Sequence, residues 1–433
     1  MHHDGDALAV SDRKFLEKLQ RQAISYFIDN QAPNGLVLDR QRNHGPRRIH
    51  GLCSTSATGM GFVALALASA EPYRLLSYDA SVARVRAGLQ AVLEKLPHER
   101  GIVPHFVHSA TNEVHGSDHF STVETAWVVA GTLWAASFLK DPALERMANR
   151  LYGRVDWHYW SGQTGTQTAG LLRHGKDRSG DFLPCYWDRL NGETAFMYVL
   201  AAGAESEKAI AETAWTQLQP FYGTIAGHRF NNADLGLFVF QYGLDLLDLE
   251  AWRAPGEVDL LAEARLATRA NHQACKQAAD AFATYRRFWG LSPGDGPGDS
   301  TEGDIYRCYT PLGPIDGTAH LTATVASVVH DTQTVLGNLQ EAEQERTLSI
   351  RGRYGFSNVN LDCEWVGQDM VGIDAGAAVL AVDNFLMENR VRDVFQGLPN
   401  VRRGLERLRF RPNSIAENRR ADERPCVPFR AAG

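Results

Sequence analysis

Apolar residues recur at helical spacing over most of the chain, and they define two kinds of predicted helix. Helices of the first kind carry charged residues on one face, and we call them outer helices. They span residues 13–29, 77–96, 142–155, 208–217, 258–288 and 332–348. Helices of the second kind are rich in small residues and poor in charge, so they must be buried on all sides, and we call them inner helices. They span residues 55–70, 122–138, 193–203, 233–249, 318–329 and 376–387.

Outer and inner helices alternate along the chain, which predicts helical hairpins packed side by side. We therefore expect an all-α fold, an (α/α)6 barrel, with a few short strands in its long loops. The 433 residues are expected to form a single domain with its core at about 12–410. A closing helix is predicted from Val391 to about Phe410, and residues 411–433 are expected to be a tail. The arginines beyond Arg402 are interpreted as a solvated terminus.

The loops that lead into the inner helices are mostly long, and they carry most of the aromatic residues, histidines and aspartates. In such a ring the N-termini of all inner helices share one rim, so these loops are expected to meet there. Long polar loops on a rigid scaffold are where a functional site is usually built. The opposite connections, such as 70–77 and 138–142, are short.

Composition and charge exclude several classes of function. The net charge is -7, with 44 basic against 51 acidic residues, which argues against the positive face that binds nucleic acid. No apolar stretch looks lipid-facing, so no membrane partner is expected, and the oligomeric state is left open. The six cysteines form no C-x-x-C pair. Because the N-terminus lacks a signal-peptide pattern, we expect a cytoplasmic protein, or a periplasmic or secreted one if a leader was removed.

Acidic residues stand at or just before the start of every predicted inner helix except the first. They are Glu124, Glu193, Asp234, Asp316 and Asp374. Acids favour the first turn of any helix, so each one alone has a structural explanation. Several carboxylates facing one cavity are what glycoside hydrolysis requires, since one must donate a proton while another activates water. Aromatic residues in the same loops could stack on sugar rings.

Other chemistries fit less well. The histidines at 105, 108, 115 and 119 are spaced like metal ligands, but no recognised zinc signature accompanies them. The glycine-rich segment 292–299 has neither a Walker lysine nor EF-hand spacing, and no G-x-S-x-G nucleophile motif occurs. We therefore expect no metal and no cofactor.

Ten short motifs resemble, in their order, those of glycoamylase-like proteins, and the characterised branch they are most similar to is glycoside hydrolase family 144. They occupy residues 35–40, 54–59, 101–106, 121–126, 152–157, 187–193, 238–242, 289–297, 316–318 and 372–376, and the resemblance covers about 15–408. It implies an (α/α)6 barrel and inverting, metal-free hydrolysis of β-1,2-glucan. The chain departs from the family pattern at three places near the expected cleft. Glu124 replaces an aspartate, Ala375-Gly-Ala377 replaces Gln-Gly-Pro, and Gly243-Leu244 replaces Ser-His.

We therefore predict an inverting glycoside hydrolase that cleaves β-1,2-glucan or its oligosaccharides. Glu193 is expected to be the proton donor, kept protonated by an apolar wall, Asp374 the ionised base, and Glu124 a ligand for hydroxyls at the cleavage subsite. The other expected contacts with the saccharide come from the loops: Asp39, Arg40, His105, Tyr186, Trp187, Trp289, Asp295 and Asp316. Two alternatives remain open, the same barrel acting on another linkage or by transglycosylation, and an inactive carbohydrate-binding protein.

Overall fold

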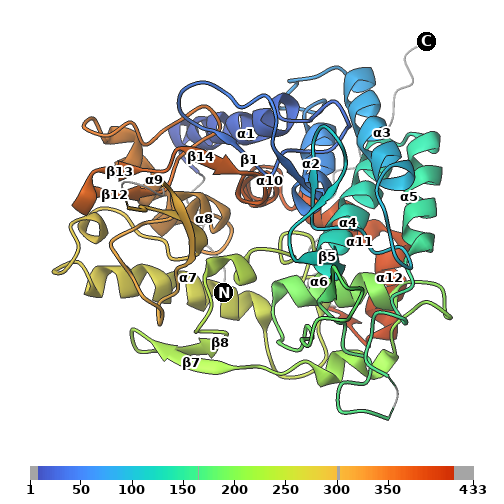
Figure 1. Ribbon diagram of the computed structural model, residues 1–433. Coiled ribbons are helices and arrows are strands. Elements are labelled where there is room, and N and C mark those ends of the chain that lie inside the picture. The colour runs from blue at the N-terminus through green and yellow to red at the C-terminus, as the bar shows by residue number, and fades with distance from the viewer. Residues whose placement is uncertain (1–7, 164, 300–302, 414–433) are drawn as a thin grey trace, which may run out of the picture.

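The protein is helix-rich, as the sequence predicts. A computed structural model describes residues 8–163, 165–299 and 303–413, and Figure 1 shows their arrangement. The α-helices are α1 (Val10–Asp29), α2 (Thr55–Leu67), α3 (Tyr78–Glu94), α4 (Thr122–Leu139), α5 (Pro142–Arg154), α6 (Gly192–Ala202), α7 (Leu260–Gln277), α8 (Leu321–Ala326), α9 (Thr332–Gln344), α10 (Gly372–Leu386), α11 (Arg390–Gly397) and α12 (Pro399–Arg407). The 3-10 helices are η1 (Glu212–Gln217), η2 (Leu237–Phe240), η3 (Thr284–Arg286) and η4 (Leu361–Cys363).

Two predicted inner helices are much shorter than expected. In the fourth, 233–249, only η2 is helical, because Gly243 adopts a φ of +80° and its backbone packs against the carbonyl of Gly192 at the start of α6. In the fifth, 318–329, α8 begins at Leu321 because Ala319 forms a β-bridge with Val359 instead.

Two outer elements also differ from the prediction. The fourth, 208–217, contains only η1. The fifth ends at Gln277, not at 288, because Asp362 accepts hydrogen bonds from the backbone amides of Ala283 and Thr284 and holds that segment in turns.

Glycines let the inner helices α2 and α4 approach each other backbone to backbone. A Cβ on Gly131 would overlap the carbonyl of Gly59, and one on Gly59 would overlap the carbonyl of Trp127. On α10, Gly376 instead makes room for a side chain, because a Cβ there would overlap the side chain of Met60 on α2. The small residues of the inner helices are therefore a packing requirement, as their composition suggests.

The inner elements contact one another in succession. α10 packs against α2, α2 against α4, α4 against α6, and α6 against η2. Gln241, just after η2, donates hydrogen bonds to the carbonyl of Ala323 and the hydroxyl of Ser327 at α8, and α8 packs against α10. The outer helix α1 lies across α10 and α2, so the first helix meets the last inner one (Figure 1).

The described residues also contain short strands in the loops, as the sequence predicts, and these strands are more numerous than the few expected. They are β1 (Arg40–Arg42), β2 (Leu52–Ser54), β3 (Phe106–His108), β4 (Val114–His115), β5 (Asp118–Ser121), β6 (Gly175–Asp177), β7 (Tyr222–Ile225), β8 (His228–Asn231), β9 (Trp252–Arg253), β10 (Pro293–Gly296), β11 (Ile305–Cys308), β12 (Val359–Asn360), β13 (Trp365–Val366), β14 (Asp369–Val371) and β15 (Arg411–Pro412). All of their ladders are antiparallel, and they join two strands or, for β2-β3-β4, three. Most belong to the long loops that precede inner helices, where they give these loops a fixed shape.

Two arginines of the C-terminal region, Arg403 and Arg407, are packed, contrary to the interpretation of the arginines beyond Arg402 as solvated, whereas Arg409 and Arg411 are exposed as expected. The predicted closing helix is divided into α11 and α12, and α12 packs against α6. Arg403 and Arg407 donate to the carbonyls of Ala202, the last residue of α6, and of Gly203 and Ala204 just after it, so they satisfy carbonyls at a helix end that the helix cannot pair by itself. Of the predicted tail, 411–413 continue into β15, which pairs with β9, and 414–433 lie outside the described residues.

One helix, α4, is long and apolar enough to cross a membrane by length and composition. Within the described part of the chain, 89% of it is buried, which is the environment a core helix needs.

Candidate active site

Glu193 lies in the first turn of α6, at the start of a run of buried apolar residues. The helix begins at a capping box, in which the Asn191 side chain accepts from the Thr194 amide and the Thr194 hydroxyl accepts from the Asn191 amide. Burial, and to a lesser extent the neighbouring Glu124 carboxylate, raise the pKa of Glu193 to about 8 against a hydrogen bond from Trp127. Glu193 is therefore mostly protonated at neutral pH, as the apolar wall predicts.

Asp374 lies in the first turn of α10, and its surroundings differ from those expected. Burial raises its pKa to about 7, the Asp295 carboxylate raises it too, and the Arg40 guanidinium opposes this. The side chain also borders a small apolar cavity between α1, α8 and α10. The expectation that Asp374 stays fully ionised is thus corrected, because its carboxylate form dominates only above about pH 7.

Tyr242 connects the surroundings of the two acids. Its hydroxyl lies 3.5 Å from Asp374 Oδ1, and both Asp374 and Glu193 help to raise its pKa, after burial. Its ring packs edge-on against Trp127, which itself contacts Glu193. Neither Tyr242 nor Trp127 was among the predicted site residues, because each lies within a run of buried apolar residues. The sequence signals were the presence of Tyr242 in the motif 238–242 and the position of Trp127 directly after the motif 121–126.

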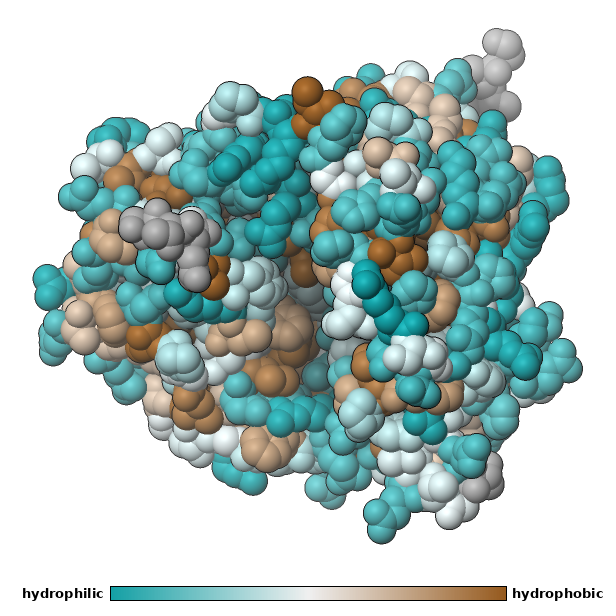
Figure 2. Space-filling model, in the orientation of Figure 1, coloured by the Kyte–Doolittle hydropathy of each residue, from teal (hydrophilic) through white to brown (hydrophobic). Residues whose placement is uncertain are grey.

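The molecular surface is hollowed at the centre of the face shown in Figure 2, and hydrophobic residues line part of the hollow. In the same orientation, it lies between α8 and β5 in Figure 1. Hydrophilic residues surround it.

Glu124, in the first turn of α4, is held by groups of the protein itself. It is 7% exposed, accepts a hydrogen bond from the Ser56 amide at 3.1 Å, and lies 3.1 Å from Nε2 of His105. The ring of His105 stacks on Phe106 at 3.7 Å. Two predicted residues, His105 and Glu124, thus form a pair beside Glu193.

Asp39, Arg40 and Asp295 form a second group beside Asp374. Arg40 on β1 reaches both carboxylate oxygens of Asp295 on β10, at 3.2 and 3.0 Å, and its Nε lies 3.3 Å from Asp39. β1 pairs with β14, which leads directly into α10 and places Arg40 opposite Val371. The structure therefore brings these three predicted residues together.

Trp187 and Tyr186 lie in the loop before α6. The Trp187 ring stacks on His174 at 3.9 Å, and its indole N–H donates to the hydroxyl of Thr122 at the start of α4. The guanidinium of Arg173 lies 4.9 Å from the centre of the Tyr186 ring.

Two other predicted residues lie apart from these groups. Trp289 is 3% exposed, and its ring lies near His272 in a surface hollow between α7 and α9. Asp316 accepts hydrogen bonds from the Tyr309 hydroxyl and the Thr318 amide, so it organises the loop before α8.

The histidines spaced like metal ligands have separate neighbours. His108 and His115 meet ring to ring across β3 and β4, whereas His105 pairs with Glu124. Among the residues that the structure describes, no group of three or more metal-binding side chains is found.

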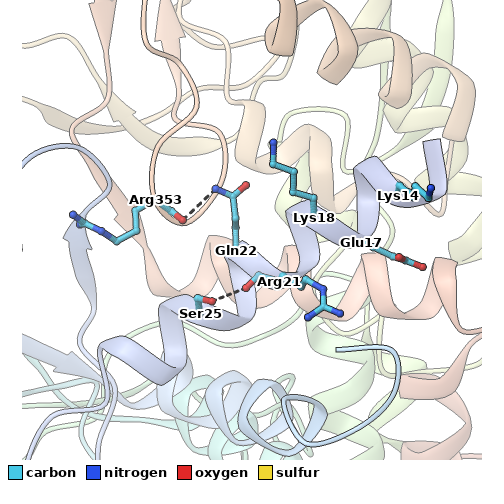
Figure 3. A pocket seen from close by; sticks show the side chains of 7 residues that line it. All are labelled: Lys14, Glu17, Lys18, Arg21, Gln22, Ser25 and Arg353. Carbon is cyan, nitrogen blue, oxygen red and sulfur yellow. Dashed lines mark hydrogen bonds between the residues drawn. The ribbon is translucent and has the colours of Figure 1, made fainter. Parts of the chain in front are cut away.

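A further hollow lies on the outer face of α1, lined by Lys14, Glu17, Lys18, Arg21, Gln22, Ser25 and Arg353 (Figure 3). Its side chains stabilise the surface. Arg21 donates to the carbonyls of Pro72 and Tyr73, and Gln22 donates to the carbonyl of Arg353. It contains no pair of carboxyl groups, so it is not a candidate for the predicted chemistry.

Solved structures with this fold cover nearly the whole chain. A structure described as a putative glucoamylase from Bacteroides caccae has 21% sequence identity and a TM-score of 0.80, with 93% of this chain and 100% of that chain covered. An endo-β-1,2-glucanase from Chitinophaga pinensis, solved with sophorotriose and glucose, has 19% identity and a TM-score of 0.80, with 93% and 99% covered. A β-1,2-glucanase from Parabacteroides distasonis has 18% identity and a TM-score of 0.77, with 92% and 60% covered.

No curated protein matches the sequence. A family model described as "Putative glucoamylase" matches residues 184–399, the region that contains both Glu193 and Asp374. These findings confirm the resemblance inferred from the short motifs. Residues 184–399 thus match the putative glucoamylase family, and the chain has the fold of structures that include endo-β-1,2-glucanases.

Proposed function

We propose that the protein is a glycoside hydrolase that cleaves β-1,2-glucan with inversion of the anomeric carbon. The observation that carries the proposal is the pair of partly buried carboxyl groups of Glu193 and Asp374, with pKa values raised to about 8 and about 7, in the first turns of two inner helices. The β-1,2 linkage is supported by the fold shared with endo-β-1,2-glucanases. The succession of contacts around the inner elements supports the (α/α)6 form in which these two helices face a common cleft.

In this mechanism, Glu193 donates its proton to the glycosidic oxygen as the bond to the anomeric carbon breaks. Asp374 accepts a proton from the attacking water, directly or through a sugar hydroxyl. The carboxyl groups thus give up one proton at Glu193 and gain one at Asp374. Tyr242 orients the Asp374 carboxyl group through its hydroxyl. Since Glu193 and Asp374 come from the third and sixth hairpins, we expect a separation of roughly 6.5–9.5 Å or more, which leaves room for water on the opposite face of the sugar.

The substrate is tested by incubating the protein with a panel of glucans of different linkages and measuring new reducing ends. We expect them from β-1,2-glucan. If reducing ends appear from another glycan alone, the enzyme cleaves the linkage of that glycan and not the β-1,2 linkage. New, longer oligosaccharides would indicate transglycosylation. Binding without turnover would indicate a carbohydrate-binding protein.

The stereochemistry is tested by proton NMR during the first turnovers. Inversion predicts that the α-anomer of the new reducing end appears first and then mutarotates. If the β-anomer appears first, Asp374 is not a base that activates water on the far face, and the inverting mechanism is wrong.

A further inference from the structure

An exposed aromatic ring lies beside a paired arginine and aspartate, next to the loop that leads into α6 and Glu193. Phe221 is 50% exposed, and the guanidinium of Arg189 lies 4.7 Å from the centre of its ring. Arg189 also contacts both carboxylate oxygens of Asp234, at 2.9 and 2.8 Å. Arg189 precedes α6, and Asp234 precedes η2, so the group joins two neighbouring loops.

The backbone fixes this group relative to Glu193. The side-chain amides of Asn231 and Asn232 both donate to the carbonyl of Leu190, at 2.6 and 2.8 Å. The Phe221 amide donates to the Asn231 side chain, and the Phe221 carbonyl accepts from the Asn232 amide. Since Leu190 lies three residues before Glu193, the β7–β8 hairpin, seen along the lower edge of Figure 1, is anchored to the segment that positions the acid.

The chemistry of the group suits a neutral polyhydroxylated ring. An exposed aromatic face packs against the C–H face of a pyranose, while carboxylate and guanidinium groups exchange hydrogen bonds with hydroxyls. Because Arg189 and Asp234 already neutralise each other, the group offers no net charge to an ionic partner. We propose that Phe221, Arg189 and Asp234 form an outer subsite for a glucose residue of the glucan, beyond those bound between Glu193 and Asp374. This inference rests on the proposed hydrolase function and extends it to chain-length preference.

The hairpin supplies its own matched control. Tyr222, the next residue, is also partly exposed at 38%, but its ring contacts a different cation, the guanidinium of Arg229 on β8, which lies 4.4 Å from the ring centre. The groups that shift its pKa are Glu263, Arg229 and Glu257, which belong to α7, β8 and the segment before α7. Tyr222 is therefore an exposed aromatic residue of the same hairpin whose charged neighbours are not those of the proposed subsite.

The test compares kcat/KM over a series of β-1,2-gluco-oligosaccharides of increasing length. For Phe221→Ala, we expect unchanged kcat/KM on the shortest oligosaccharide that is cleaved, and a loss of about fivefold to tenfold on long chains. Tyr222→Ala should keep the parent profile at every length. Phe221→Leu, which keeps the apolar bulk without the aromatic face, should show the same selective loss and guards against a folding defect in the alanine variant.

The two proposals fail in different ways. If the parent protein hydrolyses β-1,2-glucan but Phe221→Leu keeps the parent dependence on chain length, the outer subsite is wrong and the hydrolase function stands. An equal loss at all lengths would also overturn the subsite. If the parent hydrolyses no glucan, the hydrolase function fails, and the subsite fails with it.

Discussion

Glu193 and Asp374 have the same chemical group but differ in their neighbours. The charged neighbour of Glu193 is the Glu124 carboxylate, whereas Asp374 lies beside the Asp295 carboxylate and the Arg40 guanidinium together. Both pKa values are raised, and the Glu193 value stays the higher, about 8 against about 7. The productive state, with Glu193 protonated and Asp374 ionised, is therefore most populated between about pH 7 and 8. We expect kcat/KM to be bell-shaped over this range, measured as initial reducing-end release across pH, and a plateau extending down to pH 5 would contradict the assignment.

The charge of Glu124 contributes to the high pKa of Glu193. The sequence suggested that Glu124 binds a hydroxyl of the substrate, but its carboxylate already contacts Ser56 and His105. Replacing Glu124 with Gln removes a nearby negative charge, so the pKa of Glu193 should fall. We expect the alkaline limb of the pH profile of Glu124→Gln to move to lower pH. A large rise in KM with an unmoved pH profile would instead support the original hydroxyl-binding role.

Glu193 and Asp374 should make the folded protein less stable at alkaline pH than at acidic pH. A carboxyl group whose folded-state pKa is raised binds more protons in the folded state than in the unfolded state, so folding stability falls as pH rises from about 4.5 to 8. We therefore expect Glu193→Gln to have almost no turnover and a higher Tm than the parent at pH 8. The difference in Tm should vanish near pH 4. A lower Tm at pH 8 would show that the ionised carboxylate stabilises the fold.

At the scale of single elements, the contact of α2 with α4 depends on glycine. A Cβ at position 131 would overlap the Gly59 carbonyl, and neither rigid helix can move without disturbing its other neighbours. Gly131→Ala is expected to destabilise the protein by about 3 kcal/mol or more, measured by denaturant unfolding. Gly337, in the middle of α9, has open space around it, so Gly337→Ala should instead stabilise by about 0.5–1 kcal/mol. Equal effects at the two positions would mean that the close approach is not required.

Most elements could be predicted from the sequence because their helical periodicity is local. The acids of α4, α6 and α10 were found for the same reason, since each stands in the first turn of a recognisable inner helix. η2 and α8 could not be predicted at full accuracy, because a close approach to Gly192 and a bridge to Val359 override the local pattern. Trp127 and Tyr242 were missed because both stand among apolar residues. The sequence there gives no sign that the indole N–H of Trp127 and the hydroxyl of Tyr242 contact the acids.

At the scale of the whole molecule, distant parts of the chain depend on one another. Gln20 on α1 donates to the carbonyl of Val379 on α10, and Arg13 donates to the carbonyl of Leu386, so the first helix is tied to the last inner helix. We expect one cooperative thermal transition, coincident by far-UV circular dichroism, tryptophan fluorescence and residual activity. Two separated transitions would divide the chain into independently folding units and contradict the expected single domain.

The backbone contact between Gly59 and Gly131 also bears on how such a protein can diverge. Loops at the rim can exchange residues freely as long as the helices beneath them stay in place, whereas a side chain at either glycine would push two core helices apart. Amino-acid substitutions would then accumulate in the rim loops that recognise the ligand. The helical scaffold itself is shared with solved structures at sequence identities near 20%. For directed evolution of a new linkage preference, libraries should therefore randomise the rim loops and leave the paired glycines untouched.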